Sequence, residues 1–477
     1  MSATIVWFRR DLRLVDNPVL TAAAKRGPVI PVFIHAPEEE GEWAPGGAQR
    51  WWLHHSLEAL AGALGTLGSR LILRQGPSLE TLETLIRETG ADAVFWNRRY
   101  EPAVRERDRA VATGLSSRGV EIGHSKAALL WEPGEIETGS GTPYRVFTPF
   151  WKACLRATQP GPPLPAPRTL ESPSAWPASD TLDSLALKPR IPWDSGLAAT
   201  WEPGEAGAHV RLETFLESAL RDYDTGRDLP AEEGVSRISP HLHFGEISAR
   251  SVWAEVAIRR SDPVLARGAE SYLRELGWRE FAHHVLYHFP DTVTRPMNPR
   301  FADFPWHRGG AGDLAAWCKG RTGIPIVDAA MRQLYETGWM HNRARMIVAS
   351  LLVKNLNVHW LEGARWFWDT LVDADLASNT MGWQWSAGCG ADAAPYFRIF
   401  NPVRQGERFD PDGAYVKRYV PELKALPPKW VHQPWKLSEG DRRRFGFVPG
   451  ETYPEPIVDL ADSRSAALAT YKSLRAG

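Results

Sequence analysis

Residues 4–20 read TIVWFRRDLRLVDNPVL, a short apolar run that leads through a charged turn into a helical stretch. Thr4–Phe8 is a largely apolar run of the kind that forms a buried parallel strand. The following turn, Arg9–Arg13, has no G-x-G-x-x-G pattern, the usual phosphate-binding turn of dinucleotide-binding α/β proteins. The stretch therefore predicts an α/β fold whose first turn does not hold a dinucleotide in the Rossmann manner.

The same alternation of strands and helices continues through the N-terminal part of the chain. Strands are predicted at residues 4–8, 29–35, 70–73, 93–96 and 120–122. Helices are predicted at residues 18–26, 49–64, 78–89 and 105–117. Such alternation indicates a parallel sheet that helices cover on both faces. We predict a five-stranded, doubly wound, Rossmann-like α/β domain over residues 1–131.

A linker and a helical domain are predicted after the sheet. Residues 159–168 read QPGPPLPAPR, with five prolines in ten positions, which favours an extended chain. From Glu213 onward, apolar residues recur at spacings of three and four, as they do in helices. We assign residues 132–200 to an interdomain linker and residues 201–477 to an all-α domain.

The composition is that of an ordinary globular protein. The 477 residues carry 56 basic and 57 acidic side chains, so a uniformly basic DNA-coating protein is excluded. No apolar run approaches the roughly 18 residues of a membrane span, and no secretory segment precedes the first strand. Cys154, Cys318 and Cys389 provide neither a disulfide framework nor a four-cysteine metal or iron–sulfur site. We expect a cytoplasmic, monomeric protein without membrane contact.

Tryptophan is unusually abundant, with 22 residues. Most buried aromatic side chains only pack in a core, so the number alone favours a tryptophan-rich core over a redox or stacking role. Trp383 and Trp385 are two residues apart, so their side chains point to nearly opposite sides. One indole can therefore face a ligand cavity while the other faces the protein body.

Two helix faces carry side chains that core packing rarely selects. Glu275 and Trp278 are three residues apart and share one face. Asn342, Arg345 and Met346 stand at i, i+3 and i+4 and share another. A capped or solvated helix explains the second face equally well, so both interpretations stay open.

Asp373 and Asp375 flank Ala374, and paired acids of this kind are often helix caps or loop acids. The functional alternative is that Asp373 pairs with Arg345 beneath a ligand while Asp375 contacts the ligand's polar edge.

The segment 321–360 contains five Arg or Lys residues and two acids, so it carries a net positive charge. Basic charge interleaved with aromatic rings suits a nucleic-acid pocket, although a scattered solvated surface stays the alternative.

Four segments resemble the signatures of the DNA photolyase/cryptochrome family, and most of all those of a bacterial cyclobutane pyrimidine dimer photolyase. They read WFRRDLRLVDNPVL at 7–20, ELGWREF at 275–281, TGIPIVDAAMRQLYETGWMHNRARMIVASLLVK at 322–354 and DADLASNTMGWQWSAGCGADAAPYFRIFNP at 373–402. The resemblance implies an α/β antenna domain, a linker and a helical domain that binds FAD. It also implies a carbon–carbon lyase, a deoxyribodipyrimidine photo-lyase, that repairs UV-damaged DNA. In this activity light-excited FADH⁻ gives an electron to a cyclobutane dimer that has been flipped out of the duplex.

The resemblance also implies roles for single residues. FAD contacts are implied for Tyr223, Ser236, Ser239, Arg279, Asn342, Arg345, Asp373, Asp375 and Asn379. Lesion contacts are implied for Glu275, Trp278, Asn342, Arg343, Met346 and Trp385. Catalytic roles are implied for Glu275, which would stabilise charge on the dimer, for Asn379 at flavin N5, and for an electron-transfer chain of Trp383, Trp360 and Trp306. Val235 stands where the family often has Thr, so one phosphate contact is expected to be lost, and no metal is expected.

Two other activities of the family stay as alternatives. A cryptochrome-type blue-light photoreceptor is disfavoured, because plant-type receptors tend to carry Asp where this chain has Asn379. A (6-4) photoproduct photolyase is disfavoured, because such proteins place histidines where Asn342 and Met346 stand. A light-independent flavin oxidoreductase lacks support, because the chain has no nicotinamide fingerprint.

The identity of the antenna chromophore has several alternatives. Tyr100 and Glu101 are followed by Pro102, so the Asn-Glu pair with which some relatives hold a folate is absent. Trp43 stands where another branch of the family stacks a pterin. We expect 5,10-methenyltetrahydrofolate at Trp43, with a deazaflavin or an empty pocket as alternatives.

Overall fold

The computed structural model describes residues 2–306, 311–393 and 398–476. Its contacts divide the chain into two compact units. The first unit comprises residues 1–221, 236–290 and 372–377, and the second comprises 222–235, 291–371 and 378–477. The predicted domain boundaries, after residues 131 and 200, stay a prediction.

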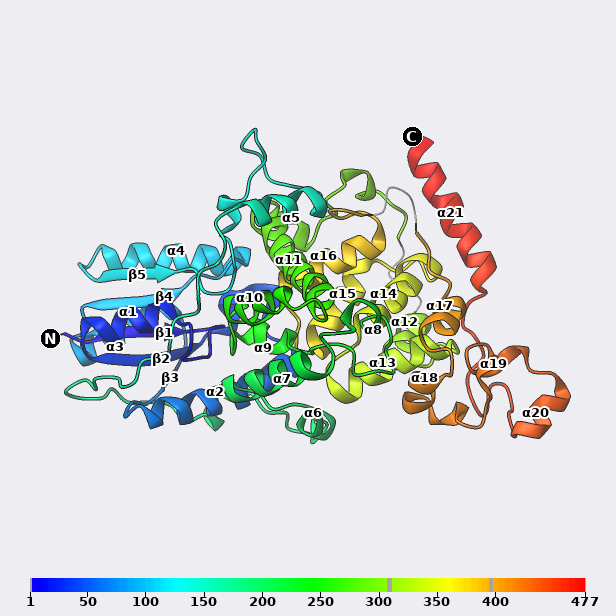
Figure 1. Ribbon diagram of the computed structural model, residues 1–477, viewed down its shortest axis with the longest axis horizontal. Coiled ribbons are helices and arrows are strands. Elements are labelled where there is room, and N and C mark those ends of the chain that lie inside the picture. The colour runs from blue at the N-terminus through cyan, green and yellow to red at the C-terminus, as the bar shows by residue number, and fades with distance from the viewer. Residues whose placement is uncertain (1, 307–310, 394–397, 477) are drawn as a thin grey trace. The chain divides into compact units, whose positions relative to one another are not determined.

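The first unit contains a five-stranded parallel sheet in the order β3-β2-β1-β4-β5 (Figure 1). The strands are β1 (Thr4–Phe8), β2 (Val29–His35), β3 (Ile72–Gln75), β4 (Ala93–Asn97) and β5 (Glu121–Ser125). The order of the strands reverses beside β1, because β2 lies on one side of it and β4 on the other. The predicted doubly wound sheet is confirmed, and its switch point lies at the carboxyl ends of β1 and β4.

Four helices accompany the sheet: α1 (Pro18–Arg26), α2 (Gly47–Thr66), α3 (Ser78–Thr89) and α4 (Pro102–Ser116). Helix α1 begins after Asn17, whose side chain accepts a hydrogen bond from the Leu20 N–H at 3.3 Å. Helix α3 ends at Gly90, where a φ of +65° forms a left-handed cap. One core cluster joins alternate residues of β1 and β2 to the apolar faces of α3 and α4, among them Ile5, Trp7, Val32, Leu82 and Val111.

Helix α2 is longer than the sequence predicts at both ends. The predicted helix ends at residue 64, whereas α2 continues through Gly65 to Thr66, so that Gly62 and Gly65 both lie within it. Leu60 and Leu64 are buried, and their packing outweighs the cost of two glycines in the helix.

Two other elements differ slightly from the prediction. β3 begins at Ile72, two residues later than predicted, and α4 begins at Pro102, three residues earlier than predicted. Proline suits the first turn of a helix, because the N–H that it lacks would have no partner there.

The rest of the chain is helical, as predicted. The first unit adds α5 (Phe147–Arg156), α6 (Ser195–Thr200), α7 (Glu205–Ser218), α9 (Ser239–Phe244), α10 (Ala249–Ile258) and α11 (Ala266–His288). The second unit contains α8 (Tyr223–Gly226), α12 (Ala311–Cys318), α13 (Pro325–Thr337), α14 (Asn342–Ser350), α15 (Trp360–Thr370), most of α16 (Leu376–Ala387), α17 (Pro402–Phe409), α18 (Ala414–Tyr419), α19 (Pro428–Val431), α20 (Glu439–Phe445) and α21 (Leu460–Ala476). Within the described ranges, no helix combines the length and apolar character that crossing a membrane requires.

A buried lysine supports the end of α16. Lys354 lies in a π-helical turn, Leu351–Asn355, and is 2% exposed. Its Nζ donates to the carbonyl of Ala387, the last residue of α16, at 2.7 Å. Burial lowers the pKa of Lys354 from 10.5 to about 7.

This pKa predicts how stability depends on pH. Between about pH 7 and 10.5 the unfolded chain binds the Lys354 proton more tightly than the folded chain does. The free energy of unfolding should therefore rise with pH across this interval, by up to about 1.4 kcal/mol per pH unit. Lys354→Met should flatten this rise in denaturant titrations, whereas Lys424→Met, at an exposed position, should not. Equal slopes for wild type and Lys354→Met would contradict the assignment.

Candidate functional site

Ser239 positions the first of the two predicted acids. It opens α9, and its Oγ donates a hydrogen bond to Asp373 Oδ2 at 2.6 Å. Asp373 is 8% exposed, so this carboxylate is buried. A carboxylate has about four acceptor positions, so Asp373 can also accept donors from a ligand. The predicted ion pair between Arg345 and Asp373 stays a prediction.

Ser236 keeps a hydroxyl proton for a ligand. Its Oγ accepts a hydrogen bond from the Tyr272 hydroxyl at 2.9 Å and one from the Ile238 N–H at 3.4 Å. Both partners are donors, so the Ser236 proton must point to a third acceptor. This arrangement suits the predicted contact with a phosphate oxygen.

Helix α11 carries three of the predicted residues. Glu275 and Trp278 share a partly exposed face, as their spacing predicts. Phe147 stacks on one side of the Trp278 indole, with ring centroids 3.7 Å apart, so only the opposite side can take a base. Arg279 uses one guanidinium nitrogen to donate to the Ala128 carbonyl at 2.8 Å, which fixes the side chain against a loop.

Asp375 lies in a strongly cationic environment. The His283 Nε2 is 3.4 Å from Asp375 Oδ2. Burial would raise the pKa of Asp375, but His283, with help from Arg279, holds this pKa well below its usual value of 3.8. Asp375 is therefore an anion, able to accept hydrogen bonds from a ligand. The sequence analysis did not identify His283, because nothing near it in the sequence points to an acid 92 residues away.

In the second unit, helix α14 presents the predicted polar face. His341 caps this helix, because its Nδ1 accepts a hydrogen bond from the Arg343 N–H at 3.1 Å. Asn342 is exposed and is therefore not needed as the cap, while Arg345 and Met346 are partly exposed. Asn342 and Met346 are thus accessible to a ligand, while Arg345 donates from Nε to the Met340 carbonyl at 2.8 Å.

Two other predicted contact residues of the second unit already have charged neighbours. Arg343 donates to Asp228 at 2.6 Å and lies over the Phe409 ring at 4.3 Å. Tyr223 is 6% exposed and has the guanidinium of Arg227 at 5.5 Å from its ring centroid. A DNA phosphate at Arg343 would have to share this cation with Asp228.

Small residues bring α15 and α16 into close contact. Gly363 lies directly against the indole of Trp383. One turn away, Asn379 donates from Nδ2 to the Ala364 carbonyl at 3.0 Å, which leaves its Oδ1 to accept a hydrogen bond from a ligand. Trp383 is 2% exposed whereas Trp385 is partly exposed, in line with the opposite directions that their spacing predicts.

The tryptophans of the predicted electron-transfer chain lie among other rings. The His359 imidazole lies 5.9 Å from the Trp306 ring centroid and 5.6 Å from that of Trp360. Trp383 lies 6.1 Å from Trp317, a buried indole to which the resemblance gives no role. Trp360 is 1% exposed and Trp306 is partly exposed, so the three predicted members include both a buried and an accessible end.

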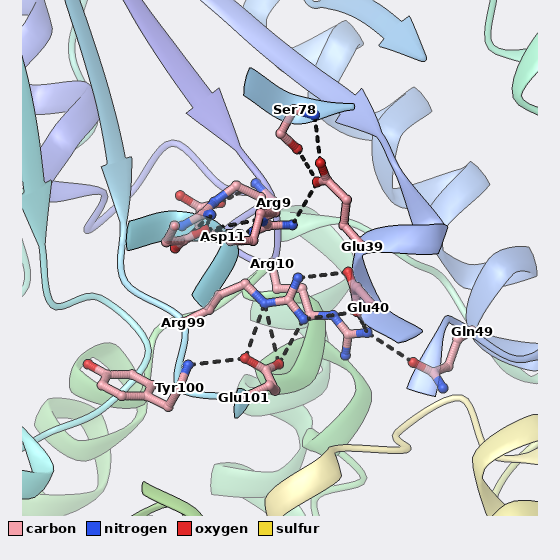
Figure 2. Close-up of polar contacts among 12 residues, drawn as sticks. Arg9, Arg10, Asp11, Glu39, Glu40, Gln49, Ser78, Arg99, Tyr100 and Glu101 are labelled. Carbon is pink, nitrogen blue, oxygen red and sulfur yellow. Dashed lines mark hydrogen bonds and ion pairs between the residues drawn. The ribbon is translucent and has the colours of Figure 1, made fainter. Parts of the chain in front are cut away.

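A cluster of charged side chains fills the switch point of the sheet (Figure 2). Arg99, which follows β4, donates to Glu40 at 2.9 Å and to Glu101 at 2.8 Å. Arg10, which follows β1, lies 3.6 Å from Glu40 and donates to Gln49 at 3.3 Å. Each of the four charged side chains is less than a fifth exposed.

The cluster keeps its charges because each has an opposite neighbour. Burial would raise the pKa values of Glu40 and Glu101, but the attraction of Arg99 and Arg10 outweighs burial and lowers both. Ligands of doubly wound sheets usually bind at this crevice. Here charged side chains occupy the crevice, which agrees with the missing glycine motif.

The predicted antenna residue, Trp43, is the last residue of a short helical segment, Pro37–Trp43, that also contains Glu40. The Trp43 side chain is 8% exposed.

Residues 4–168 match the family model described as DNA photolyase, and residues 272–473 match the one described as FAD binding domain of DNA photolyase. The chain is 47% identical to a deoxyribodipyrimidine photo-lyase of Agrobacterium fabrum, over 99% of this chain and 98% of that protein. It is 39% identical to Cryptochrome-1 of Arabidopsis thaliana, over 97% of this chain and 69% of that protein.

A solved structure is also very similar. The crystal structure of a bacterial class III photolyase from Agrobacterium tumefaciens superimposes with a TM-score of 0.96 at 46% sequence identity. The match covers 100% of this chain and 98% of that one.

The contact of Gly363 with Trp383 predicts a steric effect. A Cβ at position 363 would overlap the indole, so Gly363→Ala should lower the free energy of unfolding by about 1–3 kcal/mol. Gly382→Ala is the matched control, because position 382, also in a helix, has open space around it, and alanine there should be neutral or stabilising. Denaturant unfolding would measure both, and equal stability of the two variants would show that the indole does not pack as described.

Proposed function

The chain belongs to the DNA photolyase family, and on that premise we propose that it uses light to split cyclobutane pyrimidine dimers in UV-damaged DNA. The activity is that of a carbon–carbon lyase: the two bonds that join neighbouring pyrimidines are broken and the separate bases are restored. The finer choice of substrate, dimers of the cyclobutane type, rests on the side chains available to the lesion.

The observation that carries the proposal is the exposure of the lesion-contact residues. An acid, two indoles, an amide and a thioether are all at least partly exposed, namely Glu275, Trp278, Trp385, Asn342 and Met346. The two rings and the thioether suit the flat, apolar faces of bases, and the polar groups suit their edges. Because a dimer must leave the duplex to reach such groups, we propose a base-flipping mode of binding.

The polar residues fit FAD. Asp375 is anionic and can accept a hydrogen bond from the flavin's polar edge, while Asn379 offers Oδ1 at N5. Ser236 offers a hydroxyl proton to a phosphate, and Ser239 orients Asp373. The chemistry that FAD supplies when bound is the light-driven donation of one electron to the dimer.

The chain's own residues then have distinct tasks. Trp278 and Trp385 hold the flipped bases by stacking, which is worth about 1–3 kcal/mol per base. Glu275 contacts a base carbonyl and stabilises the negative charge that builds up on the dimer. Trp306, Trp360 and Trp383 carry electrons inward from the surface, so that the cofactor can be kept reduced between repair cycles.

A blue-light receptor is the second candidate function, because the chain is also 39% identical to a plant cryptochrome. The asparagine at position 379 and the complete set of lesion-contact residues favour repair. A receptor that does not bind a dimer has little use for Glu275, Trp278 and Trp385 on accessible faces.

An antenna chromophore is part of the proposal. The filled crevice at β1 and β4 disfavours a chromophore at the switch point, where a deazaflavin would otherwise be an alternative. Methenyltetrahydrofolate near Trp43 is therefore the favoured chromophore.

A cytoplasmic, reducing setting is part of the proposal, and the free thiols of Cys154, Cys318 and Cys389 support it. The monomeric state stays a prediction.

Glu275→Gln tests the repair role. The FAD-loaded, chemically reduced protein should split a dimer-containing oligonucleotide under blue light and not in the dark. The variant should keep its FAD but repair fewer dimers per absorbed photon, because the amide stabilises the charged dimer less well. Chromatography of the illuminated oligonucleotide measures how many dimers the wild type and the variant repair per absorbed photon. Unchanged repair per photon would remove Glu275 from the mechanism, and absence of light-dependent repair in wild type would overturn the proposed function.

Trp383→Phe tests the electron-transfer chain. Phenylalanine keeps much of the shape but is far harder to oxidise, so the variant should bind FAD yet lose photoreduction by an external thiol. Trp317→Phe is the control, because Trp317 touches Trp383 but lies outside the predicted chain. Absorption spectra recorded during illumination measure the rate. If Trp383→Phe is reduced as fast as Trp317→Phe, electrons enter by another path.

A further inference from the structure

His283 lies between two hydrogen-bond acceptors in the interior of the first unit. Its Nδ1 is 3.0 Å from the Arg279 carbonyl oxygen, one turn earlier in α11. Its Nε2 is 3.4 Å from Asp375 Oδ2, and the imidazole is 9% exposed. Neither the carbonyl nor the ionised carboxylate can donate a proton.

Two acceptors decide the charge of the ring. A neutral imidazole has one N–H and one bare nitrogen, and a bare nitrogen facing either acceptor would be repelled. Only the imidazolium, with a proton on each nitrogen, satisfies both contacts. The next residue, His284, shows the opposite case: its Nε2 accepts a hydrogen bond from the Tyr144 N–H at 3.0 Å, so that ring must be neutral.

We propose that His283 is a positioning residue, an imidazolium that balances the charge of Asp375 and holds this carboxylate in place for FAD. The inference rests on the proposed FAD contact of Asp375. It assigns to His283 a role in cofactor retention that depends on pH, because histidine is the one cation in this position that can lose its charge near neutral pH.

The surrounding groups agree with this assignment. Burial would lower the pKa of His283, but the attraction and hydrogen bond of Asp375 outweigh burial and raise the pKa above its usual 6.5. Burial lowers the pKa of His284 to about 4 and, with the charge of Arg10, lowers that of His243 well below 6.5. His243 accepts a hydrogen bond from Arg10 at 3.1 Å, so it is not a second titrating cation.

The other charged and titratable neighbours have partners of their own. Arg279 is bonded to the Ala128 carbonyl. Glu280 accepts the Leu130 N–H at 2.8 Å, and burial raises its pKa. Tyr100 meets His283 edge to face at 6.3 Å, and its hydroxyl donates to Glu132. Arg10 also attracts Asp375, but its guanidinium is shared with Glu40 at 3.6 Å. His283 makes the largest contribution to the lowered pKa of Asp375.

The sign of the pH dependence follows from the raised pKa. His283 contributes its charge fully below pH 6.5 and loses it as the pH rises through the folded-state value. Above that pH, the partly buried Asp375 carboxylate loses the imidazolium that lies 3.4 Å away, and the cofactor contact weakens. FAD should therefore dissociate more readily from the wild-type protein as the solution becomes alkaline.

Nuclear magnetic resonance of the FAD-loaded protein with labelled histidine tests the charge directly. The ring signals of His283, assigned by their absence in His283→Gln, should show an imidazolium at pH 6.5, while those of His284 should show a neutral ring. A neutral His283 ring at pH 6.5 would overturn the proposal. This readout requires neither light nor DNA, so it fails or succeeds independently of the repair activity.

Three variants test the function of that charge. His283→Gln should raise the dissociation constant of FAD about tenfold or more, because the partly buried Asp375 carboxylate loses the imidazolium beside it. His283→Arg, whose charge does not titrate, should restore affinity and abolish the pH dependence of FAD release. His284→Gln should leave the pH profile unchanged, because a glutamine can still accept the Tyr144 N–H. If glutamine and arginine at position 283 behave alike, the charge has no role and the proposal is wrong.

Discussion

A buried charge is stable only beside a partner of opposite sign, and this constraint shapes the polar interior of the first unit. It explains why Arg10, Glu40, Arg99 and Glu101 form one cluster at the carboxyl ends of the strands (Figure 2). The cluster occupies the crevice that many sheets of this topology use for a ligand. This end of the sheet has no phosphate-binding turn, and the match to the FAD binding domain of DNA photolyase lies in the helical residues 272–473.

Close packing of two helices fixes the position of Trp383, the indole proposed to exchange electrons with the cofactor. Gly363 has no side chain, so the indole of Trp383 packs directly against the backbone of α15. The neighbouring residue, Ala364, is also small. The same contact places Asn379 beside the Ala364 carbonyl, which fixes the direction of its amide. An aromatic residue that exchanges electrons must keep its distance to the cofactor, and a glycine opposite the ring achieves this without a flexible side chain in between.

The sequence predicts the sheet well, because continuous apolar strands and capped helices are local signals. β1, β2, α1 and α3 have the predicted bounds, whereas α2 continues beyond its predicted end at residue 64, through Gly65, because tertiary packing outweighs helix propensity. The spacing of the two acids before α16 leaves a helix cap and a ligand contact open as alternatives, and their role at FAD rests on the family resemblance. Their partners could not be predicted, because Ser239 and His283 come from distant parts of the chain and only folding shows which carboxylate each one meets. The roles of the lesion-contact residues rest on the family resemblance.

The chain belongs to the DNA photolyase family, and most of the residues proposed to contact FAD and the lesion lie on helices, while charged side chains fill the switch point of the α/β sheet. The central claim is the choice of lesion. The most direct measurement is a competition in which the reduced, FAD-loaded protein is illuminated with equal amounts of oligonucleotides that contain either a cyclobutane dimer or a (6-4) photoproduct, and mass spectrometry follows both. The account predicts that only the cyclobutane dimer disappears, and only in the light. Loss of the (6-4) photoproduct, or survival of both lesions while the flavin is being excited, would contradict it.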